Sequence, residues 1–523
     1  MIGEYVGMFA AAGCAGGALL LADRRLRSTF ALLALSLAPV LVIGHFWDGV
    51  EIRGLRDSPA LAAALVFGVV TAVAGLAALF RSQPRLLPVL IIAALPFRVP
   101  LHSGGESANL LLPLYLVIAA GAIAAAVGAR RDHGTHAEPG HVWLPRLLAL
   151  ATLLYALQAA YSSGFGAALQ DVCFFFVPFL VGFALLREQR WDERLLLTVM
   201  AVLLAESLAF ALFGYWQHEA RKLLWNEEVI NGNEVHTYFR VNSVFFDPNI
   251  YGRYLATVMI AALAWILWER NPRRIAMLAA ALAVLAGALF LTYSQSSYAA
   301  LLAGMVVLAA LRWSLRITVT TIAAGLVAFV IAVGIGDAGD RLFSSERSLN
   351  KTTSGRVDLI RGGLQLAGEQ PLYGQGSGAF VNDFRRREPG VAFRATAASH
   401  TEPVTVVAEQ GALGLVVYLA LLGVALATLC RKLGERAPGL RGWGGAEPSG
   451  AVSEGAARAG ILAAFIALVV HSLAYDAFLT DPITWTLLAV GMALAPATAT
   501  ERAPARPSGV EPDRGAAGAA ALP

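Results

Sequence analysis

Long apolar stretches alternate with short polar connectors along most of the 523 residues. A membrane-spanning helix needs roughly 20 mostly apolar residues, and the pattern predicts about fifteen such segments, of which the runs at 85–97 and 297–311 fit least well. They lie near 6–22, 29–46, 58–80, 85–97, 109–128, 143–161, 172–186, 194–216, 250–268, 275–292, 297–311, 317–335, 403–429, 457–473 and 482–497. The chain is therefore predicted to be an all-α polytopic membrane protein with about 12–15 transmembrane helices.

The basic residues fall in alternate connectors between these segments. They are Arg24, Arg25, Arg27, Arg81, Arg85, Arg130, Arg131, Arg187, Arg190, Arg270, Arg273, Arg274, Arg312, Arg316, Arg431, Lys432 and Arg436. The connectors between them, such as SSGFGAALQD and TYSQS, carry almost no positive charge. Because positively charged loops stay on the cytoplasmic side, the N-terminus is predicted outside and the C-terminus inside. The two long polar segments, 217–249 and 336–402, are then both expected on the outer face.

This pattern divides the chain into successive parts. We expect an N-terminal transmembrane bundle, a first outer loop, further transmembrane helices, a large outer loop with short helices and the catalytic residues, and a C-terminal group of transmembrane helices. Their bounds are 1–216, 217–249, 250–335, 336–402 and 403–497. The Gly- and Pro-rich stretch 430–456 is expected to be a flexible cytoplasmic loop, and 498–523 a disordered tail.

Composition and charge exclude two other classes of protein. With 57% hydrophobic and 15% charged residues, the chain is far from a soluble domain, in which about 25% of residues are charged. The net charge of +4 sits in the connectors, which is typical of membrane topology and not of a nucleic-acid-binding face. The three cysteines have no ligand spacing, so inert thiols are expected and no metal site.

The first outer loop ends with the sequence RVNSVFFDPNIYGRY. Asp247 and the proline after it predict a helix start, with Asn249 adding a polar group at the membrane rim. Arg240 would then lie beside a helix N-terminus, an environment suited to an anion, although an ordinary interfacial arginine has the same pattern. Arg253 lies within the first turns of the span, where charges are usually paired inward, and Glu409 is its expected partner.

The large outer loop begins with a predicted surface helix. Thr353 or Ser354 can cap the stretch GRVDLIRGGLQLAGE, in which Arg356 and Arg361 lie near the start and the middle. Such an amphipathic helix would lie along the membrane surface. Its expected apolar side is made of Val357, Ile360, Leu364 and Leu366. The turn PLYGQGSG follows, and its glycines would allow the backbone to approach a ligand closely.

His400 ends this loop. It precedes Thr401–Glu402–Pro403, a second predicted helix start. The positive end of a helix disfavours the imidazolium form, so His400 would be a neutral base able to take a proton from a sugar hydroxyl. A lone loop histidine is more often inert. Gly411 and Gly414 on the following helix would allow tight helix packing.

Taken together, SGR, PLYGQGSGAF and SHTEPVTVVAEQGALGL resemble the O-antigen ligase and polymerase superfamily of bacterial cell-surface glycan assembly. The resemblance covers roughly residues 240–430. It implies a metal-independent glycosyltransferase without a cofactor, on the outer face of the bacterial cytoplasmic (inner) membrane. The donor would be a glycan on a polyprenyl diphosphate such as undecaprenyl diphosphate.

The resemblance also implies roles for particular residues. His400 and Arg356 would be catalytic, and Arg240, Arg356 and Arg361 would bind the donor diphosphate, as a bidentate guanidinium can. One departure is Gln295, where many members of the superfamily carry arginine. Expected supporting residues are Asp247, Asn249, Arg253, Glu402 and Glu409.

Several functions stay open at this point. A polymerase, which uses a lipid-linked repeat unit as acceptor, is preferred to a ligase because no feature specific for a lipid or protein acceptor is visible. A transporter would have paired halves and broken helices that bind substrate at the midplane, and a scaffold would have no catalysis. The expected partners are the lipid-linked donor, a glycan or lipid acceptor, membrane lipids and, as further candidates, a flippase and a chain-length regulator, but no nucleic acid.

Overall fold

The computed structural model describes residues 2–47, 49–103, 106–129, 143–235, 238–313, 320, 356–387, 399–431, 433 and 449–495. Within them, twelve helical segments are long and apolar enough to cross a membrane. They are α1 (Ile2–Leu20), α2 (Arg24–His45), α4 (Pro59–Ser82), α6 (Leu112–Ala129), α7 (Trp143–Gln158) with the turn η1 (Ala159–Tyr161), α8 (Phe165–Asp171) joined through the π-helical turn η2 (Val172–Phe176) to α9 (Val177–Arg187), α10 (Glu193–Ala220), α12 (Pro248–Trp268), α13 (Pro272–Thr292), α14 (Gln295–Arg312), α20 (Glu402–Cys430) and α21 (Ser449–Ser472). The predicted polytopic helical fold is confirmed.

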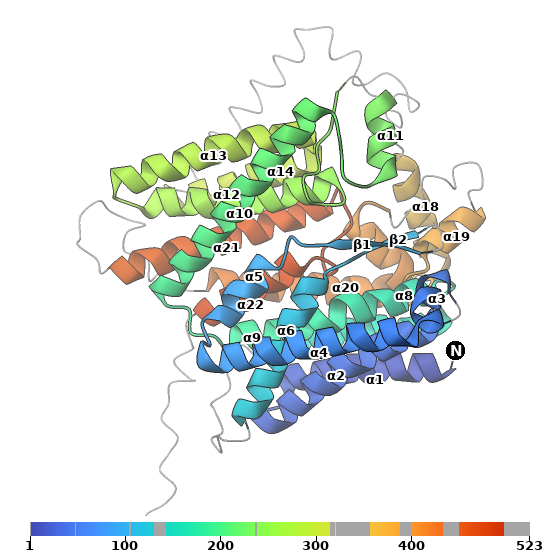
Figure 1. Ribbon diagram of the computed structural model, residues 1–523. Helices are drawn as coiled ribbons and strands as arrows, with labels where there is room; N and C mark the ends of the chain where they lie inside the picture. The colour runs from blue at the N-terminus through green and yellow to red at the C-terminus, as the bar shows by residue number, and fades with distance from the viewer. Residues whose placement is uncertain are drawn as a thin grey trace, which may run out of the picture.

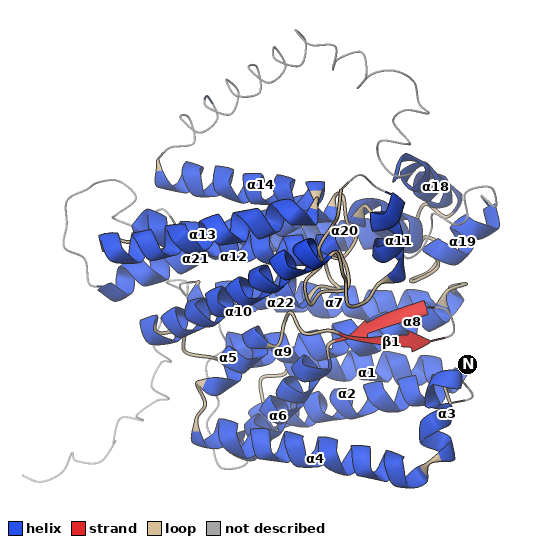
Figure 2. Ribbon diagram, turned by 45° about the horizontal axis from the view of Figure 1, so that its top comes forward, coloured by secondary structure: helices blue, strands red, loops and turns tan. Residues whose placement is uncertain are grey.

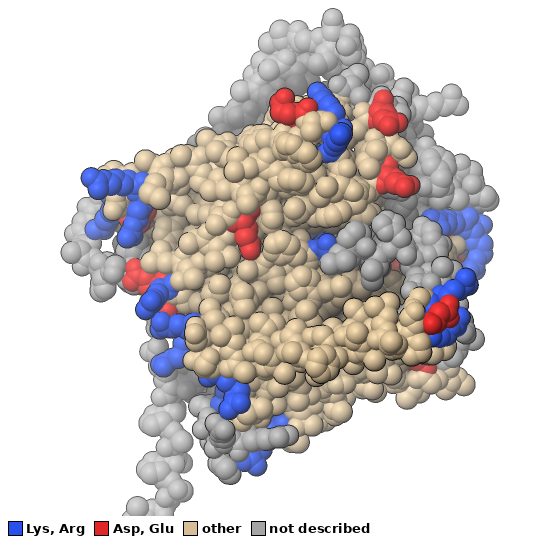
Figure 3. Space-filling model, viewed as in Figure 1, with Lys and Arg blue, Asp and Glu red and all other residues tan. Residues whose placement is uncertain are grey.

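The long helices run side by side, and the shorter elements gather at one end of the bundle (Figures 1 and 2). We call it the polar end; it carries α3 (Val50–Asp57), α11 (Glu227–Val235), α18 (Arg356–Glu369) and α19 (Phe380–Arg387). Lysine and arginine side chains also gather at the opposite end, and the belt between the ends is almost free of charge on the face shown in Figure 3. We call the opposite end the basic end, because the connectors from α4 to α5, α9 to α10 and α12 to α13 meet there.

The predicted span at 85–97 is an interrupted crossing, by which we mean a helix too short to span the membrane followed by non-helical chain. Helix α5 (Leu86–Ala93) has eight residues and is followed by an antiparallel pair of strands, β1 (Val99–Ser103) and β2 (Glu106–Leu110). The sequence LPFRVP explains the early end, because Pro96 and Pro100 lack the N–H that a helix or a central strand would use. The hairpin was not predicted, and it carries the chain toward the polar end and back to α6 (Figure 2).

The predicted span at 482–497 is also shorter than a full crossing. Helix α22 (Pro482–Leu494) has 13 residues and ends shortly before Pro496, as helices do before a proline. The predicted span at 317–335 lies outside the described residues except for residue 320, as do most of the 430–456 loop and the 498–523 tail. The proposed division into successive parts stays a prediction.

Helix α12 lies in the interior of the bundle. In its apolar window 67% of the residues are buried, against 17% for the peripheral helix α4. It packs on α13, α14 and α21, and Gly252 allows a close approach, because a Cβ there would lie 2.6 Å from the Ser297 Oγ. This interior helix carries the segment that follows the first outer loop, so its charged residues must be paired within the protein.

Candidate functional site

The start of α12 is built as the sequence predicts. Asp247 is the N-cap, its carboxylate accepts a hydrogen bond of 2.6 Å from the backbone N–H of Asn249, and proline occupies the first turn. The guanidinium of the half-buried Arg240 donates from Nε to the Thr292 carbonyl at 2.9 Å and from Nη2 to the Asn249 side-chain oxygen at 3.3 Å. These bonds orient Arg240 beside the start of α12 and use only part of its donors.

A group of serines at the start of α14 extends this network. Ser294 is the N-cap of α14 and donates a hydrogen bond of 2.8 Å to the same Asn249 oxygen. The Ser296 hydroxyl lies 3.1 Å from Nε2 of the fully buried His471, at the end of α21. A chain of polar contacts therefore connects Arg240 with His471. Gln295, at the position where the resemblance implies arginine, is exposed.

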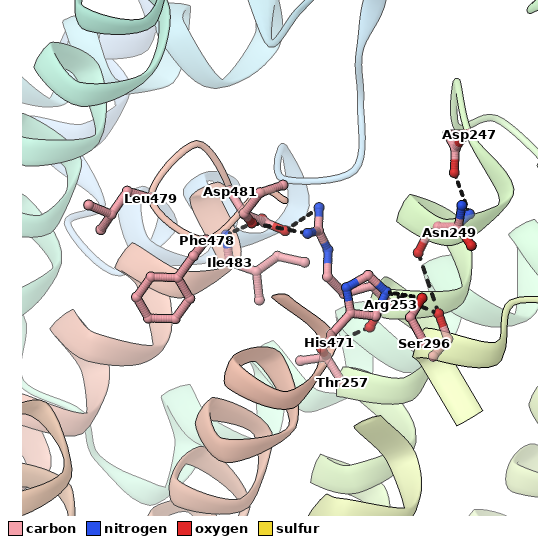
Figure 4. Close-up of polar contacts among 12 residues, drawn as sticks. Asp247, Asn249, Arg253, Thr257, Ser296, His471, Phe478, Leu479, Asp481 and Ile483 are labelled. Atoms are coloured by element: carbon pink, nitrogen blue, oxygen red, sulfur yellow. Dashed lines mark hydrogen bonds and ion pairs between the residues drawn. The ribbon is translucent and has the colours of Figure 1, made fainter. Parts of the chain in front are cut away.

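The predicted pairing of Arg253 with Glu409 is wrong. Nη2 of Arg253 lies 2.6 Å from Oδ2 of Asp481, Nη1 donates to the Ala477 carbonyl at 3.1 Å, and both charged side chains are almost completely buried. Asp481 is also the N-cap of α22. Because α22 is short, its start lies deep enough to meet an arginine in the second turn of α12. Figure 4 shows Arg253 reaching from α12 to Asp481, close to His471 and Ser296.

Glu409 has a different role from the expected one. Its Oε2 accepts a hydrogen bond from the Gly378 N–H at 2.8 Å, and its Oε1 accepts one from the Phe380 N–H at 3.1 Å. Phe380 begins α19, so Glu409 supplies from another helix the carboxylate that a helix N-terminus favours. It is a positioning residue for the polar end.

The glycine turn at 371–378 contacts protein backbone, in place of the ligand that the sequence suggested. Helix α20 is kinked at Gly411, where φ is +63°. The turn fills the kink: the Gln375 and Gly376 N–H groups donate to the carbonyls of Ala408 and Glu409 at 3.0 and 2.8 Å. A Cβ on Gly411 would lie 2.5 Å from the Leu372 carbonyl carbon. Gly411 thus allows the turn to pack directly on the backbone of α20. Gly414 lies next to the Gln410 side chain of the same helix.

His400 lies next to the predicted helix start. Helix α20 begins at Glu402 with Thr401 as its N-cap residue, although the Thr401 hydroxyl donates to the Leu473 carbonyl at 3.2 Å in place of capping the helix. His400 is half-buried and has a left-handed backbone, with φ of +60°. The Ser399 hydroxyl bonds to the Thr401 carbonyl at 2.9 Å, which supports this tight turn.

The segment between α21 and α22 completes the site and was missed in the sequence. The ring of Tyr475 lies 6.3 Å from the His400 ring and 5.7 Å from the His471 ring, and the Arg253 guanidinium lies 5.8 Å over its centre. Glu402 accepts the Phe478 N–H at 3.0 Å, and the Asp476 carboxylate of this segment accepts a hydrogen bond from the Thr405 hydroxyl at 2.5 Å. The pair Asp481–Pro482 repeats the Asp–Pro helix start at 247–248, and this signal would have found the segment.

Charges converge on Tyr475 from several elements. Burial raises the pKa of the Tyr475 phenol and Asp247 adds to the rise, whereas Arg253, Arg98 and Arg240 oppose it. Arg98, between α5 and β1, is half-buried; burial lowers its pKa, and Asp481 opposes that change. Both interrupted crossings therefore contribute a charged residue to one site, which we call the Tyr475 cluster.

Comparison with known families now bears on this arrangement. A family model described as O-antigen ligase matches residues 279–419. Residues 279–419 are thus similar to the O-antigen ligase family, and we call this region the O-antigen ligase domain. No curated protein matches the chain.

The O-antigen ligase domain contains some of the site and not all of it. His400, the serines at the start of α14 and the turn at 371–378 lie within the matched residues. Arg240, Arg253 and Tyr475 lie outside them, and the structure brings them against the domain through α12 and the 473–481 segment. The domain and the flanking helices therefore form the Tyr475 cluster together.

The remaining predicted residues lie on α18 of the O-antigen ligase domain. The helix begins at Arg356, whose side chain is outside the described part of the structure, and Arg361 is exposed. The predicted apolar side is divided between two faces, with Leu366 buried and Ile360 half-buried. Leu359 and Leu366 are buried against Phe380 and Phe384 of α19, whereas Val357 and Leu364 are exposed. The helix packs on protein with one face and leaves the other exposed.

Among the described residues, no group of three or more His, Cys, Asp and Glu side chains could hold a metal ion.

Proposed function

We propose that the chain is a membrane glycosyltransferase of cell-surface polysaccharide assembly. It would transfer a glycan from a polyprenyl diphosphate to a lipid-linked repeat unit on the outer face of the cytoplasmic membrane. The observation that carries this proposal is the convergence of His400, Arg240 and Arg253 around Tyr475, within and beside an O-antigen ligase domain.

Each step of the reaction has a residue suited to it. The acceptor hydroxyl attacks the anomeric carbon of the donor sugar, its proton goes to the His400 imidazole, and the bond to the diphosphate breaks with its electron pair leaving on the diphosphate. Arg240 and Arg356 neutralise that developing charge, because guanidinium groups bind phosphate oxygens in a bidentate way. We expect no metal to be required, so a chelator should leave the rate unchanged.

The outer face is proposed from the distribution of charge. The basic connectors lie at the end opposite to the Tyr475 cluster, and positively charged connectors stay in the cytoplasm. Interrupted crossings such as α5 and α22 are also typical of transporters. The polar residues of this chain nevertheless collect toward one end and not at the midplane, which favours the enzyme.

Replacement of His400 by alanine tests the proposal. In proteoliposomes supplied with a lipid-linked glycan, His400→Ala should lower transfer by at least about 100-fold, since general-base catalysis contributes that much. The matched control is His45→Ala, a half-buried histidine at the same end whose ring bonds to Glu4; it should keep the parent rate. Full activity of His400→Ala would refute the assignment.

Two further arms of the assay refine the proposal. Arg356→Lys keeps the charge and loses the bidentate fork, so unchanged use of the donor would contradict diphosphate binding by Arg356. A lipid-linked repeat unit offered as the sole acceptor distinguishes the polymerase from the ligase, because a ligase would transfer only to a different lipid or to a protein.

A further inference from the structure

We propose that the Tyr475 hydroxyl donates a hydrogen bond to a phosphate oxygen of the lipid diphosphate and so assists its departure. This inference rests on the proposed function and adds to it a substrate-contacting residue outside the O-antigen ligase domain. It follows from three features of Tyr475: its fixed ring, its hydroxyl and the charges around it.

The ring of Tyr475 is held on several sides. His400 and His471 lie at 6.3 and 5.7 Å between ring centres, and the Arg253 guanidinium lies 5.8 Å over the ring. Arg253 is itself fixed by Asp481 at 2.6 Å. The phenol is therefore pre-positioned beside the proposed base, and such preorganisation makes a hydrogen-bond donor effective in a transition state.

The hydroxyl of Tyr475 has no hydrogen-bond partner within the described ranges of the chain. Three tyrosines of the neighbouring helices have partners: Tyr251 donates to the Phe210 carbonyl at 3.1 Å, Tyr254 to Glu206 at 3.2 Å and Tyr155 to Asp171 at 2.6 Å. The buried Tyr418 hydroxyl of α20 has no partner among the described residues, but it lies outside the charged cluster. Tyr475 is half-buried, so its hydroxyl can be reached by a ligand. An unused donor at the centre of a charged cluster is accordingly a place for a ligand oxygen.

The surrounding charges indicate an anionic ligand. Arg98, Arg240 and Arg253 all influence the Tyr475 phenol, as does Asp247. Burial raises the pKa of the phenol, so that it keeps its proton at neutral pH and acts as a donor. A diphosphate offers several acceptor oxygens, which a neutral hydroxyl and guanidinium groups can share.

The test is Tyr475→Phe, which removes one oxygen atom and keeps the ring contacts. Because a hydrogen bond to a developing charge acts mainly in the transition state, kcat should fall about 10- to 100-fold with the melting temperature unchanged. Competitive inhibition by inorganic diphosphate should weaken in parallel. Tyr215→Phe is the matched control, because its hydroxyl donates to the Val284 carbonyl at 2.6 Å, and its transfer rate should stay at the parent value.

The outcomes separate the inference from the proposed function. If His400→Ala is inactive and Tyr475→Phe transfers within about twofold of the parent, the inference fails and the function stands. A melting temperature of Tyr475→Phe that falls together with its activity would assign Tyr475 a structural role and overturn the inference as well. If both variants keep the parent rate, the proposed function fails.

Discussion

Arg253 carries its charge within a membrane-spanning helix, and the partner that permits this is a carboxylate at the start of α22. The pair is almost completely buried. Breaking a buried ion pair by removing one partner is strongly destabilising, because the other charge is left uncompensated in a medium of low dielectric constant. Two further arginines close to Tyr475, Arg98 and Arg240, would increase that penalty.

We therefore expect Asp481→Asn to lower the free energy of unfolding by about 3–5 kcal/mol, measured as a lower melting temperature in detergent. Asparagine caps a helix as well as aspartate does, so the loss reports the charge and not the cap. The control is Asp192→Asn at the start of α10, which is also an N-cap paired with an arginine, Arg85 at 2.6 Å, but is exposed. It should cost about 0–1 kcal/mol, and equal losses would contradict the argument.

For single residues, the sequence predicted that a charged side chain would be paired, but it did not predict the correct partner. Arg253, in the second turn of a span, was expected to pair with a carboxylate inside the protein, and it does so. Its partner could not be chosen, because Glu409 and Asp481 both stand near a predicted helix start. Only packing decides that Glu409 caps α19 and that Asp481 meets α12.

Among the elements, α20 shows how a polar turn is held to a membrane-spanning helix within the O-antigen ligase domain. Its kink at Gly411 leaves the carbonyls of Ala408 and Glu409 without partners within the helix, and backbone N–H groups of the turn at 371–378 donate hydrogen bonds to them. The backbone at Gly411 is left-handed, and a side chain there would overlap with Leu372. Gly423, on the same helix, has open space around it.

Gly411→Ala should therefore destabilise the protein and reduce transfer, because the strained backbone and the overlap both act against the kink. Gly423→Ala should be neutral or stabilise by up to about 1 kcal/mol, as expected for alanine in a helix. Thermal unfolding in detergent and the transfer assay check both variants, and equal melting temperatures would show that the kink is dispensable.

The helices themselves could be predicted from the apolar pattern, and where a proline follows, so could their ends. The pattern did not show that α5 and α22 are interrupted, although the run at 85–97 fitted a full span less well than most others. For α18, the pattern did not indicate which of two partly apolar sides packs on protein. Periodicity reports apolar positions and not the neighbour that covers them.

For the whole molecule, the two ends differ in content, although lysine and arginine side chains gather at both of them (Figure 3). The Tyr475 cluster, α18 and α19 lie toward one end, and the basic connectors lie at the other (Figures 1 and 3). From the charge of the short connectors and the positive-inside rule, we expect the polar end to face the outside of the cell. That expectation needs no assumption about the reaction.

Cysteine labelling tests this orientation. In a variant with Cys14, Cys173 and Cys430 replaced by serine or alanine, a cysteine at Arg386 of α19 should react with a membrane-impermeant maleimide on intact cells. A cysteine at Arg274, near the start of α13, should react only after permeabilisation. Both parent side chains are well exposed, so access to the reagent is comparable, and the reverse pattern would invert the topology.

The short length of α22 has a consequence for how substrates would arrive. Its start meets Arg253 roughly 8 Å below the beginning of α12, since each helical residue rises about 1.5 Å. A phosphate group bound beside the Arg253–Asp481 pair would lie within the depth of the spanning helices and not above them. A lipid-linked sugar could then enter sideways between helices without being lifted from its leaflet, while water and a growing glycan occupy the space above it.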